Sequence, residues 1–315
     1  MANFYNDGCL IVFALLQALI MLALTPLFTG ISRQIRARMH SRRGPGIWQD
    51  YRDINKLLKR QEVAPSSSGL MFRLMPWVLL SSMMVVAMAL PLFLRESPFA
   101  GGGDMITLIY LLALYRFFFA LSGLDTGSPF AGVGASRELA LGILVEPILI
   151  LALLVLALIA GSTHIAVISH TLAGGWISPL ATLLALLACV FACFIEMGKI
   201  PFDVAEAEQE LQEGPLTEYS GAGLALVKWG LGLKQVVMAA LVVSLFVPFG
   251  NAPDSAPADL LLSLILSLGK ILLVFILASI VENSLARGRF LLTHHLTWLG
   301  FSLAALSYVF WLTGL

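Results

Sequence analysis

Acidic residues are concentrated in one stretch of the sequence, residues 196–221, which directly follows an apolar run. Seven acids lie there against a single base, Lys199. The acids are Glu196, Asp203, Glu206, Glu208, Glu210, Glu213 and Glu218. Carboxylates beside an apolar segment repel one another and are costly to keep charged. We therefore expect this stretch to bind a partner or to move protons.

Four of these acids follow the spacing of a helix. They are Asp203, Glu206, Glu210 and Glu213. Intervals of three, four and three residues predict one face of one helix, with Pro201 near its start and Gly214-Pro215 at its end. Like charges on one face couple their titrations, which suits proton transfer. A solvated acidic helix is the purely structural alternative.

Two further acids, Glu138 and Glu146, lie eight residues apart, and Glu146 precedes Pro147 inside an apolar run. Eight helical residues span about 12 Å, so Glu146 falls about two turns into a membrane-spanning segment. An unpaired carboxylate there is expensive. We expect Glu146 to be protonated, hydrated or paired, and Arg116 and Lys270 are the candidate partners.

The elements that position these acids are predicted to be membrane helices. The chain has 315 residues, of which 59% are hydrophobic and only 12% are charged. Soluble domains carry about 25% charged residues, so this composition indicates an all-α polytopic membrane protein. Eight apolar runs are long enough to span a bilayer, and we take residues 1–315 as one integral membrane domain. The runs lie near 10–31, 70–93, 103–122, 139–160, 180–198, 231–249, 259–281 and 295–314.

The distribution of positive charge orients the helices. The loop after the first run is the most basic segment, whereas the alternate loops hold only Arg95. Because positive loops stay cytoplasmic, we expect cytoplasmic loops at about 32–69, 123–138, 199–230 and 282–294, with both termini on the opposite side. The net charge is zero, which gives no electrostatic case for nucleic acid.

The first cytoplasmic loop divides into two parts. Residues 32–46 form a basic turn that ends in Ser-Arg-Arg-Gly-Pro-Gly, and residues 47–60 have the pattern of an amphipathic helix. Its apolar positions are Ile47, Tyr51, Ile54 and Leu58. Such a helix lies on the membrane surface, with Trp48 at headgroup level. It is either an interfacial anchor or a platform for another protein.

The three cysteines do not form a metal-binding pattern. Cys189 and Cys193 are four residues apart within an apolar run, which is typical of helix packing, and no Cys-x-x-Cys occurs. The short outer loops 94–102, 161–179 and 250–258 are rich in Gly, Ser and Pro and are expected to be plain connectors. The chain itself is therefore expected to hold no metal and no cofactor.

Two segments resemble the signatures of respiratory complex I subunit 1. The longer runs from Glu196 to Gly221 and includes Pro-Phe-Asp, Glu-Ala-Glu-Gln-Glu-Leu and Gly-Pro-Leu-Thr-Glu-Tyr-Ser-Gly. The shorter is Arg42-Arg43-Gly44-Pro45, after the first span. Within this family, segments 122–130 and 194–203 are most similar to the branch of group 4 NiFe-hydrogenases and formate hydrogenlyase.

The resemblance implies roles for particular residues. In this family, cytoplasmic loops hold a peripheral redox arm, and buried acids begin a polar path towards antiporter-like subunits. The implied path positions are Glu138, Glu146, Glu196, Asp203, Glu206, Glu208, Glu210 and Glu213. The implied docking positions are Arg36, Arg38, Arg42, Arg43, Gly44, Pro45, Glu218 and Tyr219. Glu146, Glu196 and Asp203 are the strongest path candidates because they lie in or at a span.

The resemblance also implies partners and a location. The expected partners are hydrogenase large and small subunits, iron–sulfur subunits and antiporter-like membrane subunits in a bacterial cytoplasmic membrane. The chain is then a non-catalytic subunit of an oxidoreductase complex. Nickel–iron and iron–sulfur centres are expected in those partners, and the termini are expected in the periplasm.

One departure from complex I subunit 1 bears on the choice of function. That family continues its Arg-Gly-Pro motif with Asn and a second Gly-Pro element, whereas this chain continues Gly46-Ile47-Trp48. The shorter loop disfavours quinone binding and favours the hydrogenase branch. A quinone-binding subunit of a complex I-type NADH dehydrogenase, a stand-alone secondary transporter and a purely structural membrane anchor stay open as alternatives.

Overall fold

The computed structural model describes residues 2–205, 208–252, 257–286 and 293–314. Within these residues, eight helices are long and apolar enough to cross a membrane, which confirms the predicted number of spans. They are α1 (Ala2–Met39), α3 (Leu70–Ala89), α4 (Met105–Asp125), α5 (Pro129–Ala160), α7 (Pro179–Glu196), α9 (Gly221–Phe246), α10 (Pro257–Ser284) and α11 (Thr293–Thr313).

Two of these helices begin ten residues, or nearly three turns, before the predicted spans that start at 139 and 231. Helix α5 starts at Pro129 and α9 at Gly221, so much of the predicted loops 123–138 and 199–230 is helical. Small residues there lower the hydropathy without breaking the helix, and proline suits the first helical position. The small residues also permit close packing, since a Cβ at Gly134 would lie 2.7 Å from Pro215 and 2.8 Å from the carbonyl oxygen of Ala205.

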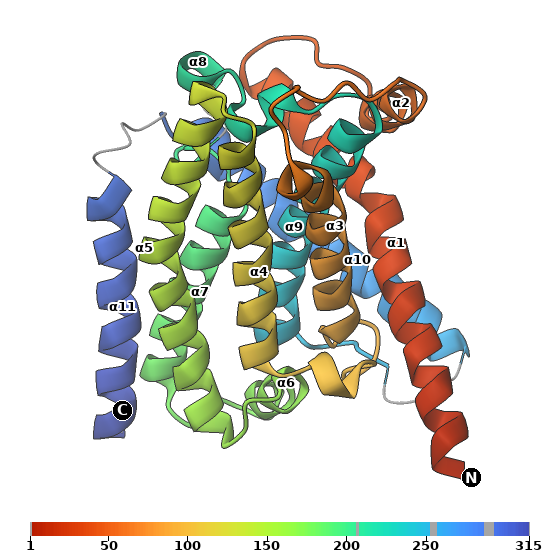
Figure 1. Ribbon diagram of the computed structural model, residues 1–315. Helices are drawn as coiled ribbons and strands as arrows, with labels where there is room; N and C mark the ends of the chain where they lie inside the picture. The colour runs from red at the N-terminus through yellow and green to blue at the C-terminus, as the bar shows by residue number, and fades with distance from the viewer. Residues whose placement is uncertain (1, 206–207, 253–256, 287–292, 315) are drawn as a thin grey trace.

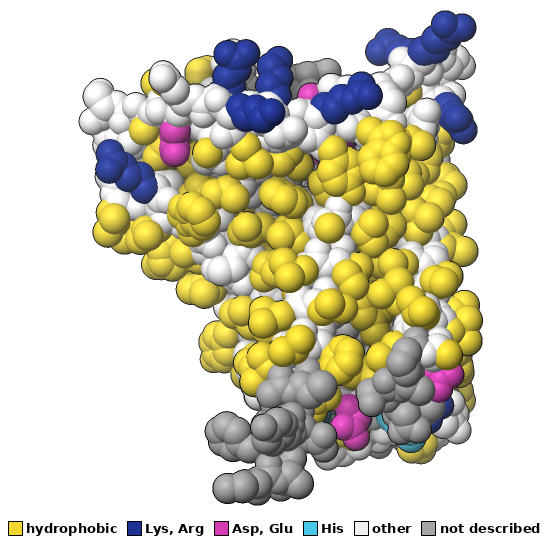
Figure 2. Space-filling view, turned by 90° about the vertical axis from the view of Figure 1, so that its right-hand side faces the viewer, with side chains coloured by type: hydrophobic (Ala, Val, Ile, Leu, Met, Phe, Trp, Pro, Cys, Tyr) yellow, Lys and Arg dark blue, Asp and Glu magenta, His cyan; other side chains and the backbone are white. Residues whose placement is uncertain are grey.

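Helix α9 forms the centre of the bundle and contacts α1, α3, α7 and α10 (Figure 1). In its most apolar window 72% of residues are buried, against 22% for α10 and α11, so those two helices lie at the periphery. Helices α10 and α11 leave about half of their apolar side chains exposed. Figure 2 shows the result as a broad hydrophobic band, with lysine and arginine side chains gathered at one end. This surface is what a lipid-embedded protein presents.

Short helices cover the two ends. Helix α2 (Gln49–Leu58), helix α8 (Glu208–Leu211) and the 3-10 helix η2 (Gly214–Glu218) lie at one end, and α6 (Ile165–Ala173) lies at the other, where α1 begins and α11 ends (Figure 1). Helix α2 confirms the predicted amphipathic helix and has no buried residue. Helix α6 corrects the expectation that 161–179 is a plain connector: its residues Ile165 and Ile168 are buried against the bundle.

Side chains from distant segments donate to backbone carbonyls that lie four residues before a proline. Because proline lacks an N–H, the carbonyl four residues earlier loses its helical donor, which is costly in a membrane. At four carbonyls in the described part of the chain that lie four residues before a proline, a side chain donates at 2.6–2.8 Å. Pro26 and Pro76 lie inside α1 and α3, whereas Pro91 and Pro248 follow the ends of α3 and α9, where the last helical carbonyls have no helical donor in any case. The pairs are Trp229 to Leu22 before Pro26, Tyr219 to Phe72 before Pro76, Gln17 to Ala87 before Pro91, and Ser169 to Ser244 before Pro248.

The predicted acidic helix is wrong. Between Pro201 and Gly214 only Glu208–Leu211 is helical among the described residues, Asp203 lies in an irregular segment, and Glu213 has a left-handed backbone with φ 71°. Like charges on one face disfavour a helix. Instead, Phe202, Val204 and Leu211 of this segment are buried in the bundle, and their packing sets the path of the chain.

Candidate functional site

An arginine on α4 is the centre of a buried ion network. The guanidinium of Arg116 forms ion pairs with Glu146 on α5 and with Glu196 on α7. Its Nε lies 3.8 Å from Oε1 of Glu138, which is also on α5. Arginine suits this role because its planar head donates in several directions at once. One side chain therefore connects three carboxylates from two other helices.

A lysine on α9 completes the network from the opposite side. Nζ of Lys234 lies 3.1 Å from Oε2 of Glu196 and 3.9 Å from Oε1 of Glu138. It also lies 4.5 Å from the centre of the Tyr115 ring and 3.4 Å from the Tyr115 hydroxyl. The ring face adds a cation–π attraction to the ion pairs. Four transmembrane helices thus contribute to one cluster of charges.

The sequence of α5 makes room for this cluster. Glu138, Gly142 and Glu146 are spaced four residues apart, so they lie on one helix face. A Cβ at Gly142 would lie 2.5 Å from Cδ of Arg116. The missing side chain therefore lets the guanidinium lie against the helix between the two carboxylates.

The network holds more negative than positive charge. Its three carboxylates (Glu138, Glu146 and Glu196) face two cations, Arg116 and Lys234. Nε of Arg116 is buried and has no hydrogen-bond partner among the described residues. Arg116 also lines a cavity of about 80 Å³, with room for a few waters at about 30 Å³ each. The arrangement is suited to holding an extra proton or a short water chain.

A second, larger chamber of about 570 Å³ lies towards the end that carries α2. Helices α1, α2 and α9 line it, together with segment 198–203. The two cavities share four lining residues: Gly198, Asp203, Leu231 and Gln235. The shared residues form the boundary between the open chamber and the buried network.

The predicted path residues separate into two groups. Glu138, Glu146 and Glu196 meet in the ion network, and Asp203 lies at the boundary between the cavities. Glu213 lines the larger, open chamber. Glu210 is on the surface, and its Oε2 lies 2.5 Å from Nη1 of Arg137. Glu206 lies outside the described residues, and Glu208 begins α8.

The predicted docking residues differ in exposure. Arg38, Arg42, Arg43 and Pro45 are exposed, and Gly44 packs so closely on α1 that a Cβ would lie 2.7 Å from Ala37. Arg36 is about half exposed and pairs with Glu282. Glu218 is half-buried. Tyr219 is buried, stacks on Phe72 with ring centres 4.1 Å apart, and belongs to the interior rather than to a docking surface.

Two lysines whose role the sequence pattern does not predict are central to the buried charges. Lys234 stands in an apolar run, and a lysine in such a run is itself a signal of a buried anion. Lys199 is the single base of the acidic stretch, but its partner Glu282 lies 83 residues away. Arg116 was correctly proposed for Glu146. The other candidate, Lys270, donates instead to the carbonyls of Val247 and Phe249.

Eight apolar helices around a buried ion network define the chain as a multi-pass membrane protein. The chain belongs to the family of complex I subunit 1: the family model described as "NADH dehydrogenase" matches residues 11–313. This confirms the family resemblance expected from the two signature segments.

Relatives place the chain near the hydrogenase branch of that family. It is 82% identical to hydrogenase-4 component C of Escherichia coli (strain K12), over 98% of each chain. It is 51% identical to formate hydrogenlyase subunit 4 of the same organism, over 95% of this chain and 98% of the relative. The fold is similar to a chain of the membrane-bound sulfane sulfur reductase (MBS), an archaeal respiratory membrane complex. That match has a TM-score of 0.83 at 23% identity and covers 95% of this chain and 98% of the other.

Proposed function

We propose that the chain is the membrane-anchor and coupling subunit of a group 4 NiFe-hydrogenase complex of the formate hydrogenlyase type. The similarity to hydrogenase-4 component C and formate hydrogenlyase subunit 4, over nearly the whole chain, supports this assignment. The chain docks a peripheral hydrogenase arm and links its redox chemistry to proton movement in the membrane.

One observation supports the coupling role. The buried network has one more carboxylate than cation, and one of its carboxylates, Glu146, reaches the membrane-facing surface. The side chain of Glu146 is 34% exposed, while that of Glu196 is 4% exposed. Ile143 and Ile150, on the same face of α5 as Glu146, are exposed too. A carboxylate on such an apolar face is expensive against lipid. Its position favours a neighbouring membrane subunit that accepts a proton there.

The geometry supports a stepwise path for the proton. Asp203 borders the open chamber and the buried cavity, so it is suited to receive a proton from the chamber side. Glu138 and Glu196 lie across the small cavity, and Arg116 contacts both of them and Glu146. A proton that neutralises one carboxylate weakens its hold on Arg116, and the guanidinium is then free to favour another. Lys234 stays as the fixed cation.

The same end of the molecule supports docking. The exposed arginines Arg38, Arg42 and Arg43 lie in the last turn of α1 and in the loop that leads to α2, at the end of the bundle opposite the start of α1 (Figure 1). We assign this end to the cytoplasm by its positive charge, and the termini to the periplasm of a bacterial inner membrane. The proposed partners are the hydrogenase large and small subunits, iron–sulfur subunits and antiporter-like subunits. These partners hold the nickel–iron and iron–sulfur centres.

The chamber supports one alternative, a quinone-binding subunit of a complex I-type enzyme. Its volume of about 570 Å³ lies in the range of small-molecule sites, and apolar residues such as Ile54 and Leu224 line it beside charged ones. The short loop after Arg43 disfavours this reading.

Gentle purification of the complex, followed by mass spectrometry of the co-purifying subunits, tests the proposal. We expect a hydrogenase large subunit and antiporter-like subunits. Recovery of a quinone-reducing NADH-oxidising module in their place would overturn the assignment.

A further inference from the structure

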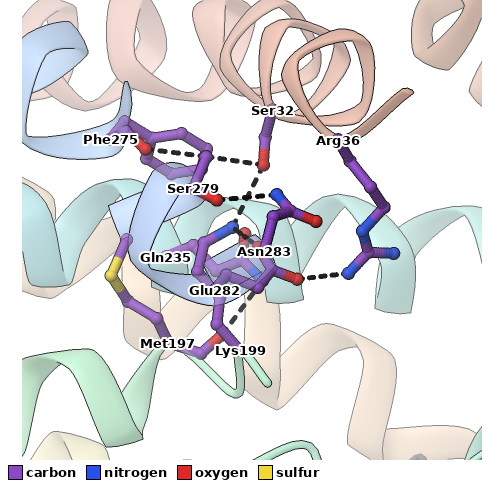
Figure 3. Close-up of polar contacts among 9 residues, drawn as sticks. All are labelled: Ser32, Arg36, Met197, Lys199, Gln235, Phe275, Ser279, Glu282 and Asn283. Carbon is purple, nitrogen blue, oxygen red and sulfur yellow. Dashed lines mark hydrogen bonds and ion pairs between the residues drawn. The ribbon is translucent and has the colours of Figure 1, made fainter. Parts of the chain in front are cut away.

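A second group of charges lies where α1, α10 and segment 197–203 meet (Figure 3). We call it the Lys199 cluster; its members are Lys199, Glu282, Arg36, Ser32 and Ser279. Nζ of Lys199 lies 2.8 Å from Oε2 of Glu282 and donates to Oγ of Ser32 at 3.1 Å. The other carboxylate oxygen of Glu282 pairs with Arg36. The side chains of both Lys199 and Glu282 are more than nine-tenths buried.

Three members of the cluster have further contacts that join α1, α10 and Lys199. Ser32 and Ser279 are 2.8 Å apart, oxygen to oxygen, which fastens α1 to α10. Lys199 Nζ also lies 5.0 Å from the centre of the Phe275 ring. Burial holds the pKa of Lys199 below its ordinary value despite the pair with Glu282. Keeping the ammonium charged inside the protein therefore costs free energy. Such a costly buried pair is weak evidence for stability alone and favours a positional role.

The backbone of Lys199 connects its side-chain contacts with α1 and α10 to the segment that separates the two cavities. The carbonyl of Lys199 accepts a hydrogen bond from the N–H of Phe202 at 2.8 Å, which closes the turn that leads into Asp203. On the other side of Gly198, the amide of Gln235 donates to the carbonyl of Met197 at 3.0 Å (Figure 3). The boundary segment is thus fixed to α9 before Gly198 and to α1 and α10 after it.

We propose that the ion pair between Lys199 and Glu282 is the positioning element of this boundary, holding segment 197–203, and Asp203 with it, as the partition between the open chamber and the buried ion network. The inference rests on the proposed coupling function, because it assigns Asp203 its place on the path. Lys199 acts through the backbone of its own turn and is a positioning residue. Arg36 is the second cation on Glu282 and is half exposed, so it supports the pair from the docking side.

The test measures hydrogen–deuterium exchange of the peptide that covers residues 197–205 in the whole purified complex. In Lys199→Met, we expect backbone exchange there to become at least about tenfold faster, because the turn loses its anchor and Glu282 loses a buried cation. Glu282→Gln should have a similar effect. Lys199→Arg keeps the cation and should restore protection. Arg36→Gln should change exchange less, since Lys199 still pairs with Glu282.

Two exposed residues provide matched controls. Lys59→Met removes a lysine at the end of α2, and Asp259→Asn removes an acid at the opposite end of α10 from Glu282. Both should leave exchange in 197–205 unchanged. Unchanged exchange in Lys199→Met, or failure of Lys199→Arg to restore protection, would overturn the inference.

Proton translocation in the same variants separates this inference from the proposed function. Faster exchange together with lost translocation, both restored in Lys199→Arg, supports the two together. Faster exchange with full translocation would support the positioning role of Lys199 and count against a proton path through Asp203.

Discussion

Lys234 on α9 and Glu196, the last residue of α7, face each other inside the bundle, with Nζ 3.1 Å from Oε2. Both side chains are almost fully buried, so each needs the other to keep its charge away from water. Glu196 also pairs with Arg116. The contact therefore joins the central helix to the helices that carry the rest of the network.

Removing the lysine should be destabilising. In Lys234→Met, Glu138 and Glu196 lose a shared cation, and we expect the free energy of unfolding to fall by about 3–5 kcal/mol. The apparent Tm of the purified complex, followed by tryptophan fluorescence, measures this. Lys59→Met, which removes an exposed lysine, is the control. An unchanged Tm in Lys234→Met would contradict a structural role for the pair.

Neutralising Glu146 should separate the proton path from packing. In Glu146→Gln, Arg116 keeps its pair with Glu196, so we expect the complex to assemble. Proton translocation should fall at least about tenfold, because the only titratable group of the network on the exposed face of α5 is lost. Hydrogen evolution and pH change in sealed vesicles measure it. Wild-type translocation in an assembled Glu146→Gln complex would remove Glu146 from the path.

A methyl group at Gly142 should displace Arg116. Because a Cβ there would lie 2.5 Å from Cδ of Arg116, Gly142→Ala forces the guanidinium away from its carboxylates. We expect a loss of about 1–3 kcal/mol in stability and a lower rate of proton translocation. The control is Gly132→Ala on the same helix, where a Cβ meets nothing within 4 Å. Equal behaviour of the two variants would argue against close packing at Gly142.

The phenol of Tyr219 should make the fold sensitive to alkaline pH. It donates to the carbonyl of Phe72 at 2.8 Å, and burial raises its pKa above the ordinary value of 10.0. The folded state thus keeps a proton that the unfolded chain releases. This contribution to stability is fully present below about pH 10 and decreases as pH rises towards the folded pKa.

Tyr219→Phe isolates that contribution. The variant should lose about 1 kcal/mol at pH 8, because the Phe72 carbonyl is left without a donor. Its Tm should also fall less steeply than that of the wild type between pH 9.5 and about pH 11. Parallel pH profiles for the two proteins would show that another group sets the alkaline response.

The exposed arginines should hold the peripheral arm. Arg42→Gln together with Arg43→Gln is expected to release most hydrogenase activity from washed membranes, and raised salt should release it more readily than in the wild type. Membrane-bound and soluble hydrogenase activities measure this. Arg95→Gln, at the opposite end of the bundle, is the control. Full retention of the arm in the double variant would exclude docking by these residues.

Local sequence pattern predicted much of this architecture. Eight hydrophobic runs, the amphipathic α2 and the spacing of Glu138 and Glu146 are short-range features, and all three appear in the structure. Lys234 joins Glu196 across 38 residues of sequence, and Lys199 joins Glu282 across 83, distances that periodicity cannot bridge. The acidic helix failed for a physical reason: burial of Phe202 and Val204 outweighed helical spacing of the acids.

The side chains that donate to proline-freed carbonyls also constrain how the protein is made. The carbonyls of Leu22 on α1 and Phe72 on α3 accept hydrogen bonds from the side chains of Trp229 and Tyr219, which are translated 207 and 147 residues later. Until α9 enters the bilayer, those carbonyls lack the hydrogen-bond donors that they have in the folded protein, which is costly in a membrane. The first two spans therefore complete these backbone hydrogen bonds only after the central helix and the residue before its N-cap have been made.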